Sequence, residues 1–175
     1  MKTLVRGVEI AYADTGGTGV PLLLIHGFPL DRTMWAEQLR GIAAHMIAPD
    51  LRGFGESAMP GGAVTVDAYA DDLHALLGAL AVKNVVVAGL SMGGYIAFAF
   101  YRKYPQLVRG LILANTKAGP DSAEGKQGRD DNAALARAKG VAVIAERMLP
   151  KMLTPKTIAE RPSVAASVSA MMARQ

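Results

Sequence analysis

Short apolar runs, punctuated by glycine, proline and charged residues, recur along the first 115 positions of the chain. Runs of this kind are too short for helices and are typical of strands, those without alternation being buried on both faces of a parallel sheet. The first two expected strands turn at Arg6-Gly7. Six strands are expected in all, at residues 2–5, 8–13, 20–25, 46–48, 84–88 and 107–114.

Helical periodicity separates several of these strands. Apolar positions three or four apart predict an amphipathic helix over residues 32–44, with Trp35 on the face that packs on the sheet. A second helix is expected after Thr65, a suitable N-cap, and a third, apolar nearly all round, over residues 95–101 before Pro105 stops it. Strands alternating with helices predict a parallel α/β sheet with right-handed crossovers.

The character of the chain changes after Asn115, where no further strand pattern occurs. A polar, glycine-containing segment leads into helical patterns at residues 130–139, 141–149, 155–160 and 162–174. We therefore expect two domains: residues 1–115 form the sheet domain, and residues 116–175 form a helical lid, or cap, attached to it.

One stretch joins a β-branched apolar run to a helix through Gly89-Leu90-Ser91-Met92-Gly93. The pattern Gly-x-Ser-x-Gly in this setting is typical of a nucleophile elbow, a turn too sharp for a Cβ two residues on either side of the serine. An ordinary glycine turn is the alternative in a chain with 19 glycines. The strand before and the helix after favour the elbow, which indicates Ser91 as a nucleophile.

Hydrophobic content, cysteine count and net charge exclude several classes of protein. Hydrophobic residues make up 51% of the 175, no apolar run could span a bilayer and residues 1–15 lack a signal-peptide core, so a globular, cytoplasmic protein is expected. The absence of cysteine excludes a disulfide, a thiolate nucleophile and a cysteine-ligated metal. The net charge of +4 comes from basic residues dispersed over residues 101–175, which favours a solvated surface over nucleic-acid binding. No metal, cofactor, nucleic-acid partner or membrane partner is expected.

Three motifs occur in order at residues 26–29 (His-Gly-Phe-Pro), 50–57 (Asp-Leu-Arg-Gly-Phe-Gly-Glu-Ser) and 89–94 (Gly-Leu-Ser-Met-Gly-Gly). Together they resemble the α/β-hydrolase superfamily, over about residues 1–115, whereas the lid is more loosely similar to that of capped esterases and enol-lactonases. The resemblance implies a mostly parallel α/β-hydrolase sheet, with about six of its eight strands present here, and a helical cap. It also implies a serine nucleophile whose acid and histidine partners follow later strands.

An oxyanion hole can be assigned beside the nucleophile. The backbone N–H of Met92, directly after Ser91 at a helix N-terminus, would point at a developing oxyanion, and by resemblance the second donor is the N–H of Phe28. Asp50 and Arg52 could suggest catalysis, but a loop-bracing ion pair is the preferred interpretation. The Gly-Phe-Gly at residues 53–55 is interpreted as a turn because no phosphate-loop pattern or helix follows it.

The triad base is missing from these residues. The three histidines, His26, His45 and His74, all precede Ser91, whereas the fold's order is serine, acid, histidine. We interpret His26 as a loop brace, His45 as lying at the opposite end of a strand, and His74 as a surface or half-buried helix residue. The chain is therefore expected to be the N-terminal part of a longer hydrolase, and its last strand an unpaired sheet edge open to self-association.

Two classes of function follow from these patterns. The first is a serine hydrolase that acts on small carboxylic esters through a Ser91 acyl-enzyme, with enol-lactones or perhydrolysis as alternative chemistry. The second is a catalytically incompetent fragment that serves as a scaffold or interaction module. The residues do not distinguish among the substrates, because the lid and pocket set that choice.

Overall fold

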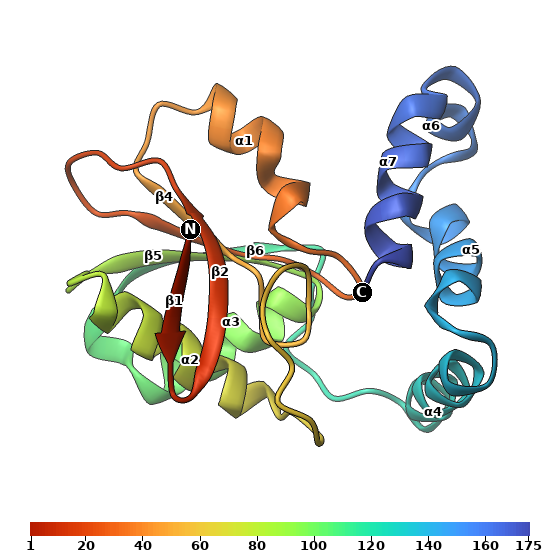
Figure 1. Ribbon diagram of the computed structural model, residues 1–175, viewed down its shortest axis with the longest axis horizontal. Helices are drawn as coiled ribbons and strands as arrows, with labels where there is room; N and C mark the ends of the chain where they lie inside the picture. Colours follow the sequence, from red (N-terminus) through yellow and green to blue (C-terminus); the bar gives the residue numbers. More distant parts are fainter. The chain divides into compact units, whose positions relative to one another are not determined.

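The computed structural model describes residues 1–175, which divide into two compact units, Met1–Ala118 and Gly119–Gln175. The first unit is built on a six-stranded sheet in the order β1-β2-β4-β3-β5-β6 (Figure 1). The strands are β1 (Lys2–Val5), β2 (Val8–Asp14), β3 (Leu22–Ile25), β4 (Met46–Pro49), β5 (Val85–Leu90) and β6 (Val108–Ala114). β4, β3, β5 and β6 are parallel, and β1 and β2 add an antiparallel hairpin. The predicted α/β class and mostly parallel sheet are confirmed.

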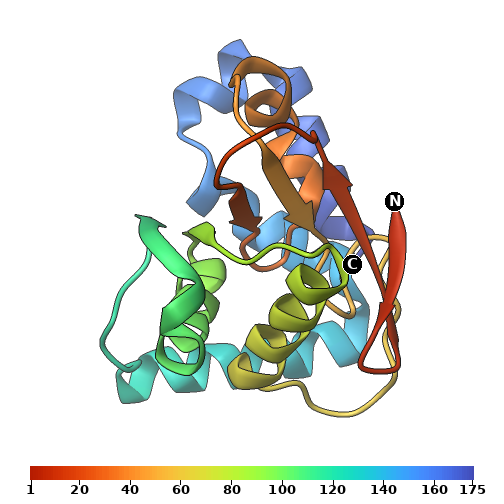
Figure 2. The same cartoon turned by 90° about the vertical axis from the view of Figure 1, so that its left-hand side faces the viewer.

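Helices cover both faces of this sheet. Helices α2 (Val66–Ala79) and α3 (Met92–Lys103) pack side by side on one face, and the short α1 (Ala36–Gly41) lies on the other (Figures 1 and 2). Thr65 caps α2 as predicted, since its hydroxyl accepts the Ala68 N–H at 3.1 Å. A 3₁₀ turn, η2 (Pro105–Leu107), follows α3.

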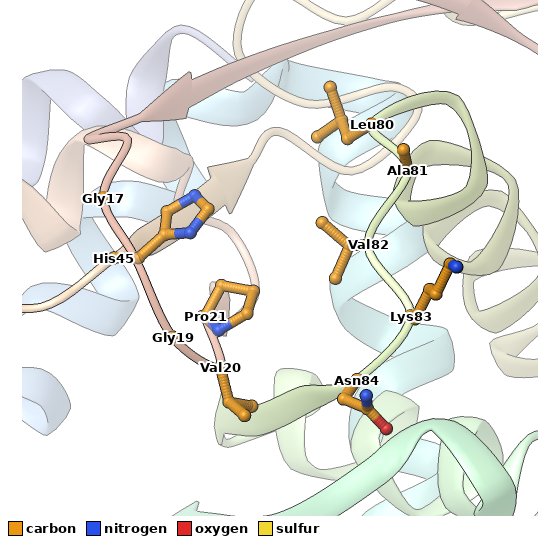
Figure 3. Close-up of a pocket in the computed structure, with 10 residues that line it drawn as sticks. All are labelled: Gly17, Gly19, Val20, Pro21, His45, Leu80, Ala81, Val82, Lys83 and Asn84. Carbon is orange, nitrogen blue, oxygen red and sulfur yellow. The ribbon is translucent and has the colours of Figure 1, made fainter.

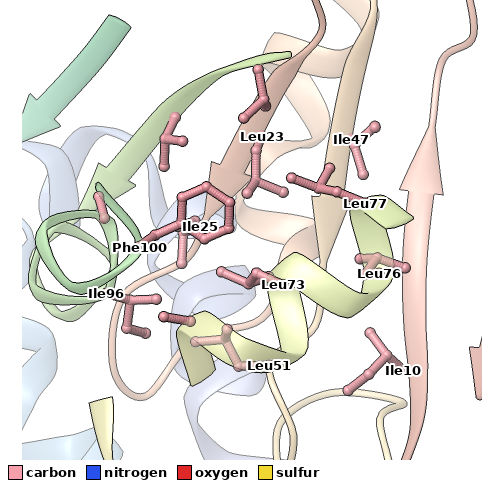
Figure 4. Close-up of a cluster of buried hydrophobic side chains, with 14 of the residues drawn as sticks. Ile10, Leu23, Ile25, Ile47, Leu51, Leu73, Leu76, Leu77, Ile96 and Phe100 are labelled. Atoms are coloured by element: carbon pink, nitrogen blue, oxygen red, sulfur yellow. The ribbon is translucent and has the colours of Figure 1, made fainter. Parts of the chain in front are cut away.

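The main core lies between the sheet and the helices α2 and α3 (Figure 4). Alternate side chains of each strand face it, so Leu23 and Ile25 enter this core whereas Leu24 faces α1. Leu73 of α2 and Phe100 of α3 close the core from the helical side and are almost completely buried. This packing fixes β3 and β5 against α3, the three elements that meet at Ser91.

The helix expected over residues 32–44 is wrong in length, although its predicted packing on the sheet is confirmed at Trp35. The structure has a 3₁₀ turn, η1 (Arg32–Trp35), and then the six-residue α1, which ends where Ile42 becomes extended. Asp31 caps η1 by accepting the Thr33 N–H at 2.9 Å, which favours a tight turn at the start of the segment. Neither element contains a buried residue, although Trp35 packs partly against the sheet.

The last strand is an unpaired sheet edge, as predicted, but the expectation that its apolar run is buried is wrong. β6 lies at the end of the strand order and pairs only with β5. Ile112 is 49% exposed and Leu113 is 41% exposed, and one edge of β6 has no neighbouring strand. The apolar run alone does not distinguish an edge strand from a central one.

The second unit is entirely helical, with α4 (Ala123–Lys139), α5 (Val141–Met152), α6 (Pro155–Glu160) and α7 (Pro162–Ala173). α4 begins seven residues before the expected position of 130, because Ser122 caps it by accepting the Gly125 N–H at 3.2 Å. Ile144, Met171 and Met172 form the buried centre of this unit. None of the helices in the chain is long and apolar enough to span a membrane.

Candidate active site

Ser91 occupies a strained turn between β5 and α3. Its backbone has φ 51° and ψ −111°, a region that non-glycine residues rarely adopt. Three hydrogen bonds hold the turn: the Ser91 N–H donates to Ala114 O at 2.9 Å, and Ser91 O accepts from the Gly94 N–H at 2.9 Å and from the Thr116 hydroxyl at 2.8 Å. Local strain of this kind persists where the surrounding structure over-determines it, and it is concentrated at functional sites.

The two glycines of the motif are required by the close approach of three backbone segments. A Cβ on Gly89 would overlap the main chain of Gly93, and a Cβ on Gly93 would overlap the carbonyl oxygens of Ile25 and His26. The elbow therefore packs backbone to backbone against the end of β3. This contact brings Ser91 to the loop that follows β3.

That loop carries Phe28 past Ser91. A Cβ on Gly27 would lie 3.2 Å from Leu90 O and 3.5 Å from Ser91 Cβ, so residue 27 is directly beside the elbow. Phe28 is 43% exposed, and its ring meets that of Phe54 edge-on with centroids 6.2 Å apart. Neither the Phe28 N–H nor the Met92 N–H donates to another group of the protein.

His26 is buried and has both ring nitrogens engaged. Nε2 accepts the Leu51 N–H at 3.0 Å, which places the proton on Nδ1, where it is shared with Gly27 O at 3.1 Å. Burial lowers the pKa of His26, so the ring is neutral at pH 7. The imidazole links two loops and has no free nitrogen to accept the Ser91 proton.

The other two histidines lie away from the elbow. His45 precedes β4, contacts Asp14 with Nε2 2.8 Å from Oδ1, and lines a shallow pocket of about 520 Å³ with Asn84 (Figure 3). Since Asn84 precedes β5 and Ser91 follows it, this pocket is roughly 20 Å from Ser91 at about 3.3 Å per residue. His74, on α2, stacks on Tyr104 with ring centroids 3.9 Å apart.

The loop after β4 is braced by different ion pairs from the one expected. Asp50 pairs with Arg32 of η1, and Arg52 pairs with Asp72 of α2 at 2.5 Å, so the predicted pairing of Asp50 with Arg52 is wrong. The hydrogen bonds to Asp72 raise the pKa of Arg52. No group of three or more His, Asp or Glu side chains is arranged to hold a metal ion.

The fold and the elbow together define an α/β protein that presents a serine at the carboxyl end of a central parallel strand. A family model described as alpha/beta hydrolase fold matches residues 20–139, and the chain belongs to this family.

The relatives of this chain include esterases and lipases. Lipase 1 of Psychrobacter immobilis is 44% identical over 134 residues, which are 70% of this chain and 42% of the lipase. A thermophilic esterase from Thermogutta terrifontis is 46% identical with a TM-score of 0.91, covering 98% of this chain and 64% of that one. The enol-lactonase from Burkholderia xenovorans LB400 is 26% identical with a TM-score of 0.92, covering 99% and 67% respectively. The chain thus spans less than half of the lipase and about two thirds of each structural neighbour, and it is related to carboxylic ester hydrolases.

Proposed function

We propose that the protein is a serine hydrolase that acts on small carboxylic esters through an acyl-enzyme on Ser91. The observation that carries the proposal is the strained Ser91 backbone between β5 and α3, directly beside the Phe28 loop. The similarity to an esterase and a lipase supports the same class of reaction.

In the proposed reaction the Ser91 hydroxyl oxygen attacks the ester carbonyl carbon while its proton passes to a base. The carbonyl oxygen becomes an oxyanion, which the N–H groups of Phe28 and Met92 stabilise. Loss of one such donor typically lowers kcat by about 10²–10³. The C–O bond to the alcohol then breaks, the alcohol leaves with a proton, and water hydrolyses the acyl-enzyme to release the acid.

The base is proposed to lie outside these 175 residues. His26 is fully engaged, while His45 and His74 lie on other parts of the sheet domain. The esterase neighbour has residues beyond those that this chain covers, which is where an acid and a histidine could be supplied.

Active-site labelling tests the nucleophile. A fluorophosphonate probe should modify Ser91 in the full-length protein, and the Ser91→Ala variant should not react. Identification of the modified peptide by mass spectrometry is required, because a surface hydroxyl could react slowly. Failure to label Ser91 would refute the proposal.

A substrate panel tests the finer part of the proposal. Short-chain p-nitrophenyl esters should be hydrolysed faster than long-chain ones. An enol-lactone and perhydrolysis of acetate should be measured alongside, since one neighbour is an enol-lactonase. A preference for long acyl chains would contradict the assignment to small esters.

A scaffold without catalytic activity is the second candidate for the 175-residue chain, because none of its histidines is placed to activate Ser91. An oxyanion hole and binding alone leave only roughly 10³–10⁴-fold acceleration over water. Turnover of p-nitrophenyl acetate at an enzyme-like rate by the purified chain, abolished in Ser91→Ala, would exclude this candidate.

A further inference from the structure

Asp50 is a completely buried carboxylate whose oxygens are all engaged. Oδ1 accepts the backbone N–H of Arg32 at 2.7 Å. Oδ2 accepts the guanidinium of the same Arg32 and the backbone N–H of Glu56 at 2.9 Å. Such charge-assisted hydrogen bonds offset the cost of burying the carboxylate. The side chain therefore holds two separate loops together.

Arg32 completes a bridge between these loops. Its second guanidinium nitrogen donates to Glu56 Oε1 at 2.8 Å, and this bond lowers the pKa of the Glu56 carboxyl. The Arg32 side chain is only 16% exposed and that of Asp50 is fully buried, so little water competes for the Arg32–Asp50 pair, whereas Glu56 is 64% exposed. Gly55 closes the loop over Asp50, since a Cβ there would overlap the carboxylate.

The two loops meet at the proposed oxyanion donor. The segment from His26 to Arg32 contains Phe28, and residues 50 and 51 anchor both of its ends. At the first end His26 Nε2 accepts the Leu51 N–H, and at the second Asp50 holds the Arg32 N–H. Only five residues separate these anchors, and the Leu30 N–H donates to Gly27 O at 2.9 Å within them.

We propose that Asp50 and Arg32 are positioning residues that hold the backbone N–H of Phe28 beside Ser91. This inference rests on the serine-hydrolase function proposed above, because it assigns the pair to the oxyanion hole of that reaction. The pair acts through the Phe28 loop and touches no reacting atom. A displacement of about 1 Å at a reacting group can cost about 10²-fold in rate, so small shifts of the loop matter.

A second buried ion pair provides a matched control. Asp72 is 3% exposed and pairs with Arg52, whose side chain is 14% exposed, in the same region of the sheet domain. That pair joins the β4 loop to α2 and makes no hydrogen bond or ion pair with residues 26–32. Asp72→Asn therefore removes a similar buried charge without releasing the Phe28 loop.

The test measures acetylation of Ser91 by p-nitrophenyl acetate, followed by intact mass, in the 175-residue chain. The variants are Asp50→Asn, Arg32→Lys and Asp72→Asn, with Ser91→Ala to subtract acetylation elsewhere. Arg32→Lys keeps the charge but cannot bridge two carboxylates in the same way, and it serves if Asp50→Asn fails to fold. Hydrogen exchange of the Leu30 N–H in the same proteins reports on the loop without any need for catalysis.

For Asp50→Asn and Arg32→Lys we expect the saturating acetylation rate to fall by about 10- to 100-fold, with half-saturation changed by less than about threefold. Protection of the Leu30 N–H should fall by about tenfold or more. Asp72→Asn should leave all three quantities near wild type. Wild-type rates and protection in a folded Asp50 or Arg32 variant, or equal losses in Asp72→Asn, would overturn the inference. If wild-type Ser91 of the 175-residue chain is not acetylated at all, this chain lacks activity on its own, and the exchange result decides whether the pair holds the loop. The hydrolase proposal itself is decided separately, by fluorophosphonate labelling of the full-length protein.

Discussion

Replacing Gly93 by alanine adds a single methyl group at the point where the elbow meets β3. That Cβ would overlap the carbonyl oxygens of Ile25 and His26, which are main-chain atoms of a buried strand and the residue after it. Rotation of a side chain cannot relieve the overlap. Gly93 has no positive φ, so the expected effect is steric and not a matter of backbone preference.

The size of the effect follows from the atoms involved. Overpacking in a core typically costs about 1–3 kcal/mol, and a clash with the main-chain atoms of both Ile25 and His26 places this substitution near the upper value. For a chain of this length about 3 kcal/mol corresponds to a fall in Tm of about 6–12 °C. Separation of Ser91 from the Phe28 loop by about 1 Å should also slow labelling of Ser91 by about 10²-fold.

Thermal unfolding followed by circular dichroism measures the first effect, and fluorophosphonate labelling measures the second. Gly78→Ala is the matched control, because Gly78 is exposed near the end of α2 and an added Cβ would meet nothing within 4 Å. Helix propensity should make that control more stable by about 0.5–1 kcal/mol. Wild-type Tm and wild-type labelling in Gly93→Ala would refute the steric argument.

Three further predictions concern the edge, the buried histidine and a helix cap. The 175-residue chain should self-associate through β6, and Ile112→Lys should shift it toward monomer in light scattering; a monomeric wild type with cooperative melting would contradict this. Because burial lowers the pKa of His26 from its ordinary 6.5, the unfolded chain binds the extra proton as pH falls. Stability should therefore decline below pH 6.5, by up to about 1.4 kcal/mol per pH unit more than in His26→Asn, and equal slopes in chemical denaturation would count against it. Thr65→Ala should lose about 1 kcal/mol of stability through the N-cap of α2, measured by urea unfolding, whereas an unchanged midpoint would show that the cap contributes nothing.

The parts of the fold that depend on neighbouring residues, such as strands and helix ends, could be predicted from the sequence. Apolar runs located all six strands to within two residues or so, and Thr65 and Pro105 marked helix boundaries correctly. The predicted helix over residues 32–44 was wrong because Asp31 caps a 3₁₀ turn there. The spacing of apolar residues does not distinguish a 3₁₀ turn from the start of an α-helix. The edge position of β6 was predicted, but the exposure of Ile112 was missed because an apolar run does not show how far the faces of a strand are covered.

In the candidate site, too, the contiguous motif could be predicted from sequence, whereas contacts between distant residues could not. Ser91 and its glycines form a contiguous motif, so the turn could be predicted from ten residues of sequence. The partner of Asp50 could not, because Arg32 is 18 positions away and Arg52 was the nearer cation. Only the folded loops reveal which charges meet. A signal was present in the sequence, since Arg32 closely follows the motif at residues 26–29, but nothing in that spacing selected it over other arginines.

The contact between Gly93 and the Ile25 carbonyl has a consequence for redesign of this scaffold. Since main chain meets main chain there, the distance between the elbow and the end of β3 does not depend on the shape of a core side chain. Leu73 and Phe100 could then be exchanged for other apolar residues of similar volume while the turn keeps its geometry, provided that the sheet keeps its register. Core side chains can therefore be varied while the turn at Ser91 keeps its geometry. The stability of the protein could be engineered by repacking the core with the elbow sequence left unchanged.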